Sequence, residues 1–398
     1  MSNEVKHVSA TSLQAYKACP VRYRIGYVEG IRQAEEPQPF RMGTSWHKGL
    51  EVLEMIAGTI LEDGSVITEE NRLEIAVTEA TAVYQDIPTW ADPTEWAVER
   101  EIVANALAAY HWLYGTGSEY ETVATELQFE LPLVNPETGH ATPNFVRVGK
   151  IDRIVRHKGT GRLMIQEYKS TSKSIDSGST YWDRLRKDTQ SKFYITAARD
   201  LKMERPGSQL PGFNDLSGLL HDVFHKPTIK PSKLTMGESA EFVKTGDYCG
   251  QKFSPYLQTS GGTSNPALPY LTVDGVPAEI EPGKKEGTFA LRETPGMFGA
   301  RLLQDMTQRP EFYFARREIA FTDAELEDFR YQVWALQKTI AEMTNSGHWY
   351  ENEQQCEATF KCAFCPICYM NVDVFHGATP PGFKRLHAAE AEQTEATE

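Results

Sequence analysis

Three residues with the chemistry of a metal-dependent hydrolase stand close together near the middle of the chain. Asp152 ends the run Gly149-Lys150-Ile151-Asp152, and Glu167 and Lys169 follow in the next strand-like segment. The turn signal at 157–161 between the segments predicts a hairpin that brings the three side chains together. Carboxylate oxygens suit Mg²⁺ or Mn²⁺, and a nearby lysine can stabilise the charge that develops during hydrolysis. The spacing therefore predicts a metal-dependent phosphodiesterase.

Alternation along the two predicted strands places both carboxylates on buried faces rather than on the solvent side. The apolar residues that share a face with them at a period of two are Val146, Val148 and Ile154 for Asp152, and Leu163 and Ile165 for Glu167. Stray charges are normally found on the exposed face of a strand. The pattern thus favours a functional role for the two acids.

Charge is unevenly distributed along the sequence. The whole chain has a formal net charge of −14, yet between Asn144 and Lys173 the only acids are Asp152 and Glu167, against Lys or Arg at 147, 150, 153, 156, 158, 162, 169 and 173. A basic strip around a metal site suits a phosphate backbone, and the acidic remainder limits indiscriminate binding. A nucleic acid is therefore the expected partner, and a solvated basic hairpin is the alternative.

The sequence predicts a cytoplasmic protein with no membrane partner. No apolar run approaches the length of a membrane span, and the segment 1–7 lacks secretory character.

Local signals predict the elements that carry these residues. Ser9 to Ser12 supply caps for a first helix, and a helix beginning near Gly43 carries His47. The capping box Thr322-Asp323-Ala324-Glu325 begins another helix, and Asn345-Ser346-Gly347 ends it. Further helices are expected over 68–86, 96–114 and 181–201, and strands over 123–132, 145–156, 162–169 and 218–224.

The expected fold class is α/β (α+β), with a mixed central sheet flanked by helices. We divide the chain into an N-terminal helical region (1–120), a core (121–230), an insertion or covering loop (231–300), a C-terminal helical region (301–384) and a disordered tail (385–398). The insertion is rich in Gly and Pro and weak in periodicity, and the tail is rich in Ala, Glu and Thr.

Further motifs surround the three residues in a fixed order. They are Ser12-Leu13-x-x-Tyr16-x-x-Cys19-Pro20, Gly43-Thr44-Ser45-Trp46-His47, Glu126 in a strand, Gln190-Ser191-Lys192-Phe193-Tyr194 and a terminal cysteine group. With them the chain resembles the RecB-like branch of the PD-(D/E)XK nucleases, which includes CRISPR-associated adaptation nucleases and phage-encoded exonucleases. The resemblance covers about residues 9–60, 123–225 and 310–370, and Ile151 stands where the family name has Pro. It implies a restriction-endonuclease-like core whose N- and C-terminal parts are joined by a metal cluster.

The resemblance also implies roles for individual residues. The catalytic metal, Mg²⁺ or Mn²⁺, would be held by His47, Asp152, Glu167 and the backbone carbonyl of Tyr168. Lys169 would position the attacking water, and the catalytic set would be His47, Asp152, Glu167 and Lys169. Glu126 would be a further ligand, of a second metal or behind the first, although Glu130 lies close enough in sequence to leave the register open.

Gln190 and Tyr194, four residues apart and therefore on one helix face, would bind DNA or order the site. Ordinary packing remains the alternative for Tyr194. His47, taken without the resemblance, is more typical of a satisfied histidine at a helix start.

Four of the six cysteines crowd into thirteen residues, at positions 356, 362, 365 and 368. In an intracellular chain such crowding indicates metal ligation before disulfides. The resemblance implies a [4Fe-4S] cluster held by Cys19, Cys356, Cys362 and Cys368, with Cys365 as an alternative ligand. Zinc would accept the same four sulfurs. A clamp between such distant segments is expected to be structural, and Cys249 is an ordinary thiol.

The predicted function is a DNA exonuclease of phage recombination or replication, and the segment 310–318 is similar to the phage members. The sequence has no G-x4-G-K-[ST] motor motif. The protein would therefore degrade strands unaided or work beside a separate helicase or annealing protein. The expected substrate is single-stranded DNA or strand ends. The alternatives are a CRISPR spacer-acquisition nuclease and a non-catalytic DNA-binding module, against which the complete catalytic set argues.

Overall fold

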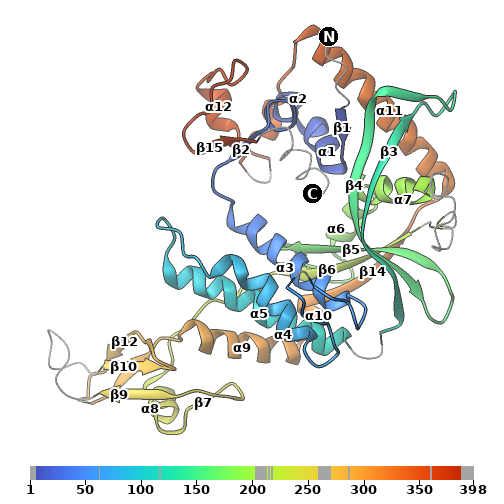
Figure 1. Cartoon of the computed structure of the whole chain (residues 1–398). Helices are drawn as coiled ribbons and strands as arrows, with labels where there is room; N and C mark the ends of the chain where they lie inside the picture. Colours follow the sequence, from blue (N-terminus) through green and yellow to red (C-terminus); the bar gives the residue numbers. More distant parts are fainter. Residues whose placement is uncertain are drawn as a thin grey trace.

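A mixed sheet forms the centre of the computed structural model, which describes residues 6–61, 63–115, 118–201, 213, 216, 218–258, 270–285, 287–358 and 361–386 (Figure 1). Within these residues the strand order is β1 (Lys6–Val8), β4 (Ala141–His157), β5 (Leu163–Thr171), β6 (Gly218–His225) and β14 (Phe314–Ala320), with β3 (Tyr120–Val134) also beside β4. The predicted strands all form, and β3 and β4 extend beyond their predicted ends.

The long strand β4 organises the sheet. It is antiparallel to β3 along most of its length, antiparallel to β5 and parallel to β1. Because β3 occupies one whole edge of β4, β1 and β5 must share the other edge. Beyond β5, the pairing with β6 is parallel and the pairing of β6 with β14 is antiparallel. The expected mixed sheet flanked by helices is therefore confirmed.

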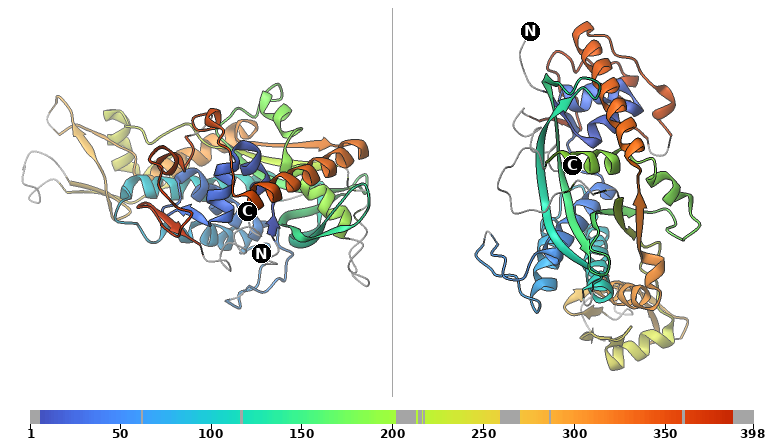
Figure 2. Two further views of the ribbon diagram at one scale, coloured as in Figure 1. Left: turned by 90° about the horizontal axis from the view of Figure 1, so that it is seen from above. Right: turned by 90° about the vertical axis from the view of Figure 1, so that its right-hand side faces the viewer.

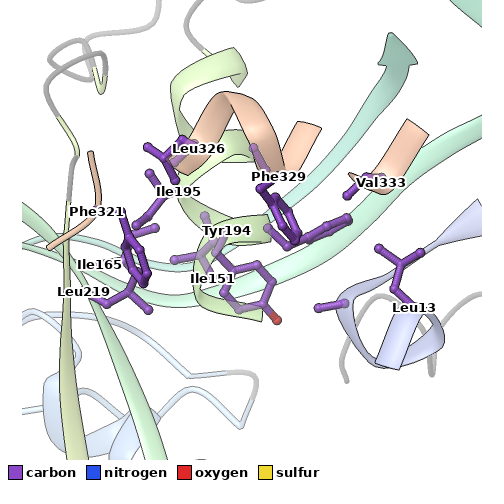
Figure 3. Packing of buried hydrophobic residues seen from close by; sticks show 14 of the residues in the cluster. Leu13, Ile151, Ile165, Tyr194, Ile195, Leu219, Phe321, Leu326, Phe329 and Val333 are labelled. Carbon is purple, nitrogen blue, oxygen red and sulfur yellow. The ribbon is translucent and has the colours of Figure 1, made fainter. Parts of the chain in front are cut away.

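Separate hydrophobic clusters cover the two faces of the sheet. Alternation along β5 and β6 sends Ile165 and Leu219 to one face and Tyr168 and Phe224 to the other. The first face packs against α1 (Ala10–Ala18), α7 (Thr189–Leu201) and α11 (Asp323–Ser346), and Figure 3 shows residues of this cluster. The second face packs against α3 (Gln38–Glu54), α4 (Arg72–Thr81), α5 (Pro93–Tyr114), α9 (Pro295–Gln308) and α10 (Pro310–Tyr313). A short 3₁₀ turn (Ala82–Tyr84) follows α4.

The helix ends follow the predicted capping chemistry in two cases. Ser9 caps α1, and the Thr322 hydroxyl accepts a hydrogen bond from the Glu325 amide at the start of α11. Helix α11 ends at Gly347, whose φ of 74° is the left-handed conformation that glycine adopts readily.

The helix predicted over 181–201 is wrong as a single element. It is divided into α6 (Thr180–Leu185) and α7. Asp188, between them, accepts a hydrogen bond from the Ser191 amide and so begins a new helix.

The two ends of the chain meet in one small subdomain. It comprises α2 (Pro20–Tyr23), a π-helical turn (Arg24–Val28) and β2 (Ile31–Gln33), with a 3₁₀ turn (Glu353–Gln355), α12 (Cys365–Tyr369) and β15 (Phe383–Arg385). Strands β2 and β15 pair antiparallel, and Ile25, Ile31, Phe364 and Ile367 share an apolar cluster. The predicted tail begins too early, since Arg385 pairs with Ile31; residues 387–398 lie outside the described part.

The segment predicted as an insertion or covering loop is a folded unit. It contains α8 (Met236–Thr245) and the short strands β7 (Asp247–Tyr248), β8 (Gln251–Lys252), β9 (Pro255–Gln258), β10 (Tyr270–Val273), β11 (Val276–Pro277), β12 (Ile280–Pro282) and β13 (Phe289–Leu291). Leu234, Phe242, Leu271 and Leu291 form its own apolar cluster. Strands of two to four residues are too short to show a period, which is why the sequence pattern was weak.

The insertion and the subdomain of the chain ends lie at opposite ends of the molecule (Figures 1 and 2). Helix α9 crosses the predicted boundary at 300/301, and β14 places part of the C-terminal region inside the sheet. In the described residues, no helix is both long enough and apolar enough to cross a membrane.

Replacing Phe329 by Ala tests whether α11 holds the first cluster together. Phe329 is 2% exposed, so we expect Phe329→Ala to lower the free energy of unfolding by about 3–5 kcal/mol. Phe40→Ala is the matched control, because Phe40 is 66% exposed and its loss should change stability by less than about 0.5 kcal/mol. Guanidinium unfolding measures both, and equal losses would contradict this account of the core.

Candidate active site

His47 and Asp152 meet where α3 crosses β4. His47 Nδ1 lies 3.6 Å from Asp152 Oδ2, and the Tyr168 amide donates to the same oxygen at 3.2 Å. The His47 side chain is 40% exposed and that of Asp152 is 14% exposed. The Asp152 carboxylate is therefore fixed by an imidazole and a backbone amide, and solvent reaches the pair through the histidine.

Glu167 and Lys169 project from the same face of β5, as the alternation predicted. Lys169 Nζ donates to Glu167 Oε1 at 2.9 Å and also to Gln190 Oε1 of α7. Gln190 Nε2 in turn donates to the Tyr194 hydroxyl at 3.2 Å. The second oxygen of Glu167 is buried and has no hydrogen-bond partner among the described residues. An orphaned carboxylate oxygen is costly to bury, and a cation would satisfy it.

Tyr194 is buried in the first cluster, as the packing alternative expected, and Gln190 is half-buried beside Lys169. Tyr194 is 3% exposed and packs within the first cluster, and Gln190 is occupied by Lys169 and Tyr194. Of the two predicted roles for this pair, the geometry therefore favours ordering of the site over binding of DNA.

Burial and neighbouring charges tune the ionisation of the cluster. Burial raises the pKa of Glu167 to about 7, although the charge of Lys169 opposes the shift. Burial also lowers the pKa of His47, but the Asp152 carboxylate outweighs it and the net shift is upward. Burial would likewise raise the pKa of Asp152, and the charge of His47 reverses it, so that the pKa lies below its ordinary value. Asp152 is thus charged at neutral pH, while Glu167 exchanges its proton there.

Glu126 stands beside Asp152, and Glu130 does not. Thr125 pairs with Arg153 and Leu127 with Ile151, which places Glu126 opposite Asp152, whereas Glu130 pairs with Val148 and is exposed. Glu126 adopts a φ of 49°, an unfavourable conformation for a residue other than glycine. Backbone strain of this kind tends to accumulate at functional sites.

Glu126 belongs to a carboxylate group that the sequence did not fully predict. It forms an ion pair with Lys150. Burial raises its pKa to about 7, and the nearby carboxylates of Glu51 and Asp152 add to the shift. Glu51 follows His47 by one helical turn on α3, and this i,i+4 spacing is the signal that could have identified it.

The donors at this site fit a divalent cation, although they contact one another in this structure. His47, Asp152 and Glu167 provide an imidazole and carboxylate oxygens, one of which lacks a partner. Across the residues that the structure describes, no three His, Cys, Asp or Glu side chains surround a point that an ion could occupy. Asp152 accepts a hydrogen bond from the Tyr168 amide and lies in ion-pair contact with His47, and Glu167 accepts a hydrogen bond from Lys169.

The four cysteines predicted as cluster ligands, at 19, 356, 362 and 368, belong to the region where the chain ends meet, and among the described residues they enclose no point that an ion could occupy. Burial, and then the charges of Glu351, Cys362, Cys19 and Cys356, raise the pKa of Cys368 to about 12. These thiols therefore lie within electrostatic reach of one another. The Asn352 amide donates to Cys19 Sγ at 3.4 Å, and Cys362 and Cys368 pack against the local apolar cluster.

Cys365 is a fifth thiol in this subdomain, and its charge contributes to the raised pKa of Cys356 and of Cys362. It is 1% exposed, and its Sγ donates to the Cys356 carbonyl at 3.6 Å. This hydrogen bond gives Cys365 a packing role of its own.

The predicted basic strip is not an open basic surface. Arg147 pairs with Asp200, Arg153 with Glu54, Lys150 with Glu126 and Arg162 with Glu318. Arg147 and Arg153 are also buried. Much of the local positive charge is therefore neutralised by acids distant in sequence, which a count along the chain cannot detect.

The strand pairing of β4 and β5, the histidine from α3 and the Lys169–Gln190 contact together define a nuclease-like site on a mixed sheet. The chain matches a family model, described as the PD-(D/E)XK nuclease superfamily, over residues 7–369, and it belongs to this superfamily. No curated protein matches the sequence.

Cation binding to this site should release protons. Because the pKa of Glu167 is about 7 and that of His47 is raised, a divalent ion must displace protons from both near neutral pH. We expect the affinity for Mn²⁺ to rise between about pH 6 and about pH 8, by up to about tenfold per unit for each proton displaced. Calorimetry in buffers of different ionisation enthalpy measures the release. Glu167→Gln should weaken binding and flatten the pH dependence, and equal wild-type affinity at both pH values would contradict the assignment.

Proposed function

We propose that this protein is a metal-dependent DNA exonuclease of RecB-like type that acts in phage recombination or replication. The observation that carries the proposal is the convergence of Asp152, Glu167 and Lys169 from two paired strands with His47 from α3. Membership of a nuclease superfamily supports phosphodiester hydrolysis as the reaction. The complete set of four residues favours an active nuclease over a non-catalytic DNA-binding module.

Each residue has a defined task in this proposal. His47, Asp152, Glu167 and the Tyr168 carbonyl would hold Mg²⁺ or Mn²⁺, which supplies Lewis acidity toward the scissile phosphate. Lys169 holds a proton at Nζ and directs it toward the attacking water and the charge that builds on the phosphate. Its pKa is raised because the Glu167 carboxylate outweighs the effect of burial, so the ammonium form is present throughout the neutral range. Glu126, with Lys150 and Glu51, lies where a second cation or an adjacent phosphate would be contacted.

The substrate that we propose is single-stranded DNA or a strand end. The chain has no nucleotide-binding motor motif of its own, so a helicase or an annealing protein would supply the single strand.

Removing Asp152 or Lys169 tests the catalytic assignment. We expect Asp152→Ala and Lys169→Ala each to slow degradation of end-labelled DNA by about 10²–10³-fold with Mg²⁺ or Mn²⁺ present. Lys158→Ala is the control, because Lys158 lies exposed in the turn of the same hairpin. Unchanged degradation by either site variant would reject the proposal. Release of nucleotides from labelled ends, and none from circles, distinguishes an exonuclease from an endonuclease.

We further propose that Cys19, Cys356, Cys362 and Cys368 hold a [4Fe-4S] cluster, with zinc as the alternative metal. The support is the electrostatic proximity of the four thiols and the amide hydrogen bond to Cys19 Sγ. Cys365 remains the alternative ligand.

Anaerobic purification with an iron count and an absorption spectrum tests the cluster. We expect iron in the wild type and its loss in Cys368→Ala, while Cys249→Ala retains it because Cys249 lies in the insertion. Zinc in place of iron would reject the cluster and leave the nuclease proposal standing.

A further inference from the structure

A buried chain of hydrogen bonds ties the first turn of α7 to β6. The Ser191 amide and hydroxyl both donate to Asp188 Oδ2, at 3.0 and 2.9 Å. Ser191 Oγ also lies 3.3 Å from His221 Nε2. Ser191 and His221 are fully buried, with 0% of each exposed. The link therefore joins two elements in the interior of the protein, on the strand next to the one that carries Glu167.

The direction of these hydrogen bonds follows from the donors available. Ser191 gives its single hydroxyl proton to Asp188, so the oxygen must accept from His221, and Nε2 carries the imidazole proton. Nδ1 is then an acceptor, and it is buried with no hydrogen-bond partner in the described part of the chain. Burial lowers the pKa of His221 to about 4, which keeps the ring neutral. A neutral donor at this position costs less to bury than a charged one.

Gln190 connects this link to the reactive lysine. It precedes Ser191 in the same helical turn, and its side-chain oxygen accepts from Lys169 Nζ. His221 is the register partner of Glu167 across the β5–β6 ladder. The link thus holds the first turn of α7, which carries Gln190, against β6. Strand β6 lies next to β5, which carries Glu167 and Lys169.

We propose that His221 and Ser191 are positioning residues, which hold the first turn of α7 so that Gln190 fixes the ammonium group of Lys169 for attack on the phosphodiester. The expected effect on kcat rests on the proposed nuclease function. The effect on the Lys169–Gln190 contact does not depend on that function. Contacts from α1, in which Lys17 and Gln14 donate to Thr189 and Asp188, hold the other side of the same turn. They secure the helix but do not face β6, so they cannot replace the link.

Four variants and a control test the proposal in the full-length protein. His221→Leu and Ser191→Ala each break the link, and we expect kcat for DNA degradation to fall on the order of ten- to a hundredfold with little change in KM. His221→Gln places a donor nitrogen at the same number of bonds from the backbone and should restore part of the loss. The double variant should lose no more than either single variant, because both remove the same interaction.

Ser239→Ala is the matched control for loss of a buried hydroxyl. Ser239 is also 0% exposed, and its hydroxyl donates to the Thr235 carbonyl at 2.8 Å and accepts from the Leu291 amide at 2.9 Å, within the insertion. We expect it to lower the thermal unfolding midpoint as Ser191→Ala does, without changing kcat. The positioning role would be rejected if the variants lost thermal stability with kcat unchanged. It would also be rejected if the kcat losses of the single variants multiplied in the double variant.

Two further results keep the proposal separate from protein folding and from the nuclease function. If His221→Leu does not fold, the smaller change in Ser191→Ala decides the kinetic question. If the wild type degrades no DNA, the proposed function fails, and crystal structures of the wild type and Ser191→Ala decide the geometric question. Loss of the Lys169–Gln190 contact in the variant would support the positioning role, and its retention would overturn it.

Discussion

Strand β5 carries a carboxylate and an ammonium group although both faces of the sheet are covered by helices. Glu167 is 1% exposed, and neither it nor Lys169 would remain ionised in such a place without a partner. Their mutual ion pair and the Gln190 oxygen give Lys169 two acceptors, but one oxygen of Glu167 is left without a partner in the described residues. Burying that oxygen without a hydrogen-bond partner costs free energy, and a bound cation can remove this cost. The need to pair these buried charges also explains why Gln190 lies within hydrogen-bond distance of Lys169.

The opposite face of β5 and β6 shows how the protein treats buried charge that has no chemical task. Asp222 accepts hydrogen bonds from Tyr110 at 2.6 Å, from Gln166 at 2.7 Å and from Arg316 at 2.8 Å. Arg153 pairs with Glu54 and also donates to Gln166. These groups satisfy one another and join β4, β5, β6 and β14 with α3 and α5. A satisfied network of this kind rigidifies the sheet, so that it can support the less satisfied site on its other face.

Local signals in the sequence were sufficient where a local interaction decides the structure. The hairpin that carries Asp152 and Glu167, the buried strand β6 and the capped helix α11 depend on turn residues, alternation and side chains three residues apart. Other features depend on residues that are distant in sequence. Asp188, which begins α7, accepts a hydrogen bond from Gln14 of α1, and the choice between Glu126 and Glu130 required the register of β3 against β4.

Several parts of the site left no readable signal for the same reason. His221 appeared only as one residue of a buried strand, because its partner Ser191 lies thirty residues earlier on α7. The basic strip looked open because the acids that neutralise it, such as Asp200 and Glu318, come from other elements. The insertion looked structureless because its core is formed between strands too short to show a period.

The chain ends meet around an apolar cluster of their own, although Tyr23 and Tyr27 of the subdomain also pack in the larger cluster on the sheet. The apolar cluster around the cysteines shares no residue with the cluster that packs α1, α7 and α11 on the sheet. Helix α1, from the start of the chain, and α11, near its end, already belong to that larger cluster and close the long loop between them. Metal bound by the thiols would therefore stabilise the small subdomain, while the position of Asp152 and Lys169 depends on the sheet and on α7. Tyr23 and Tyr27 are the residues through which the subdomain contacts the cluster that packs α1, α7 and α11.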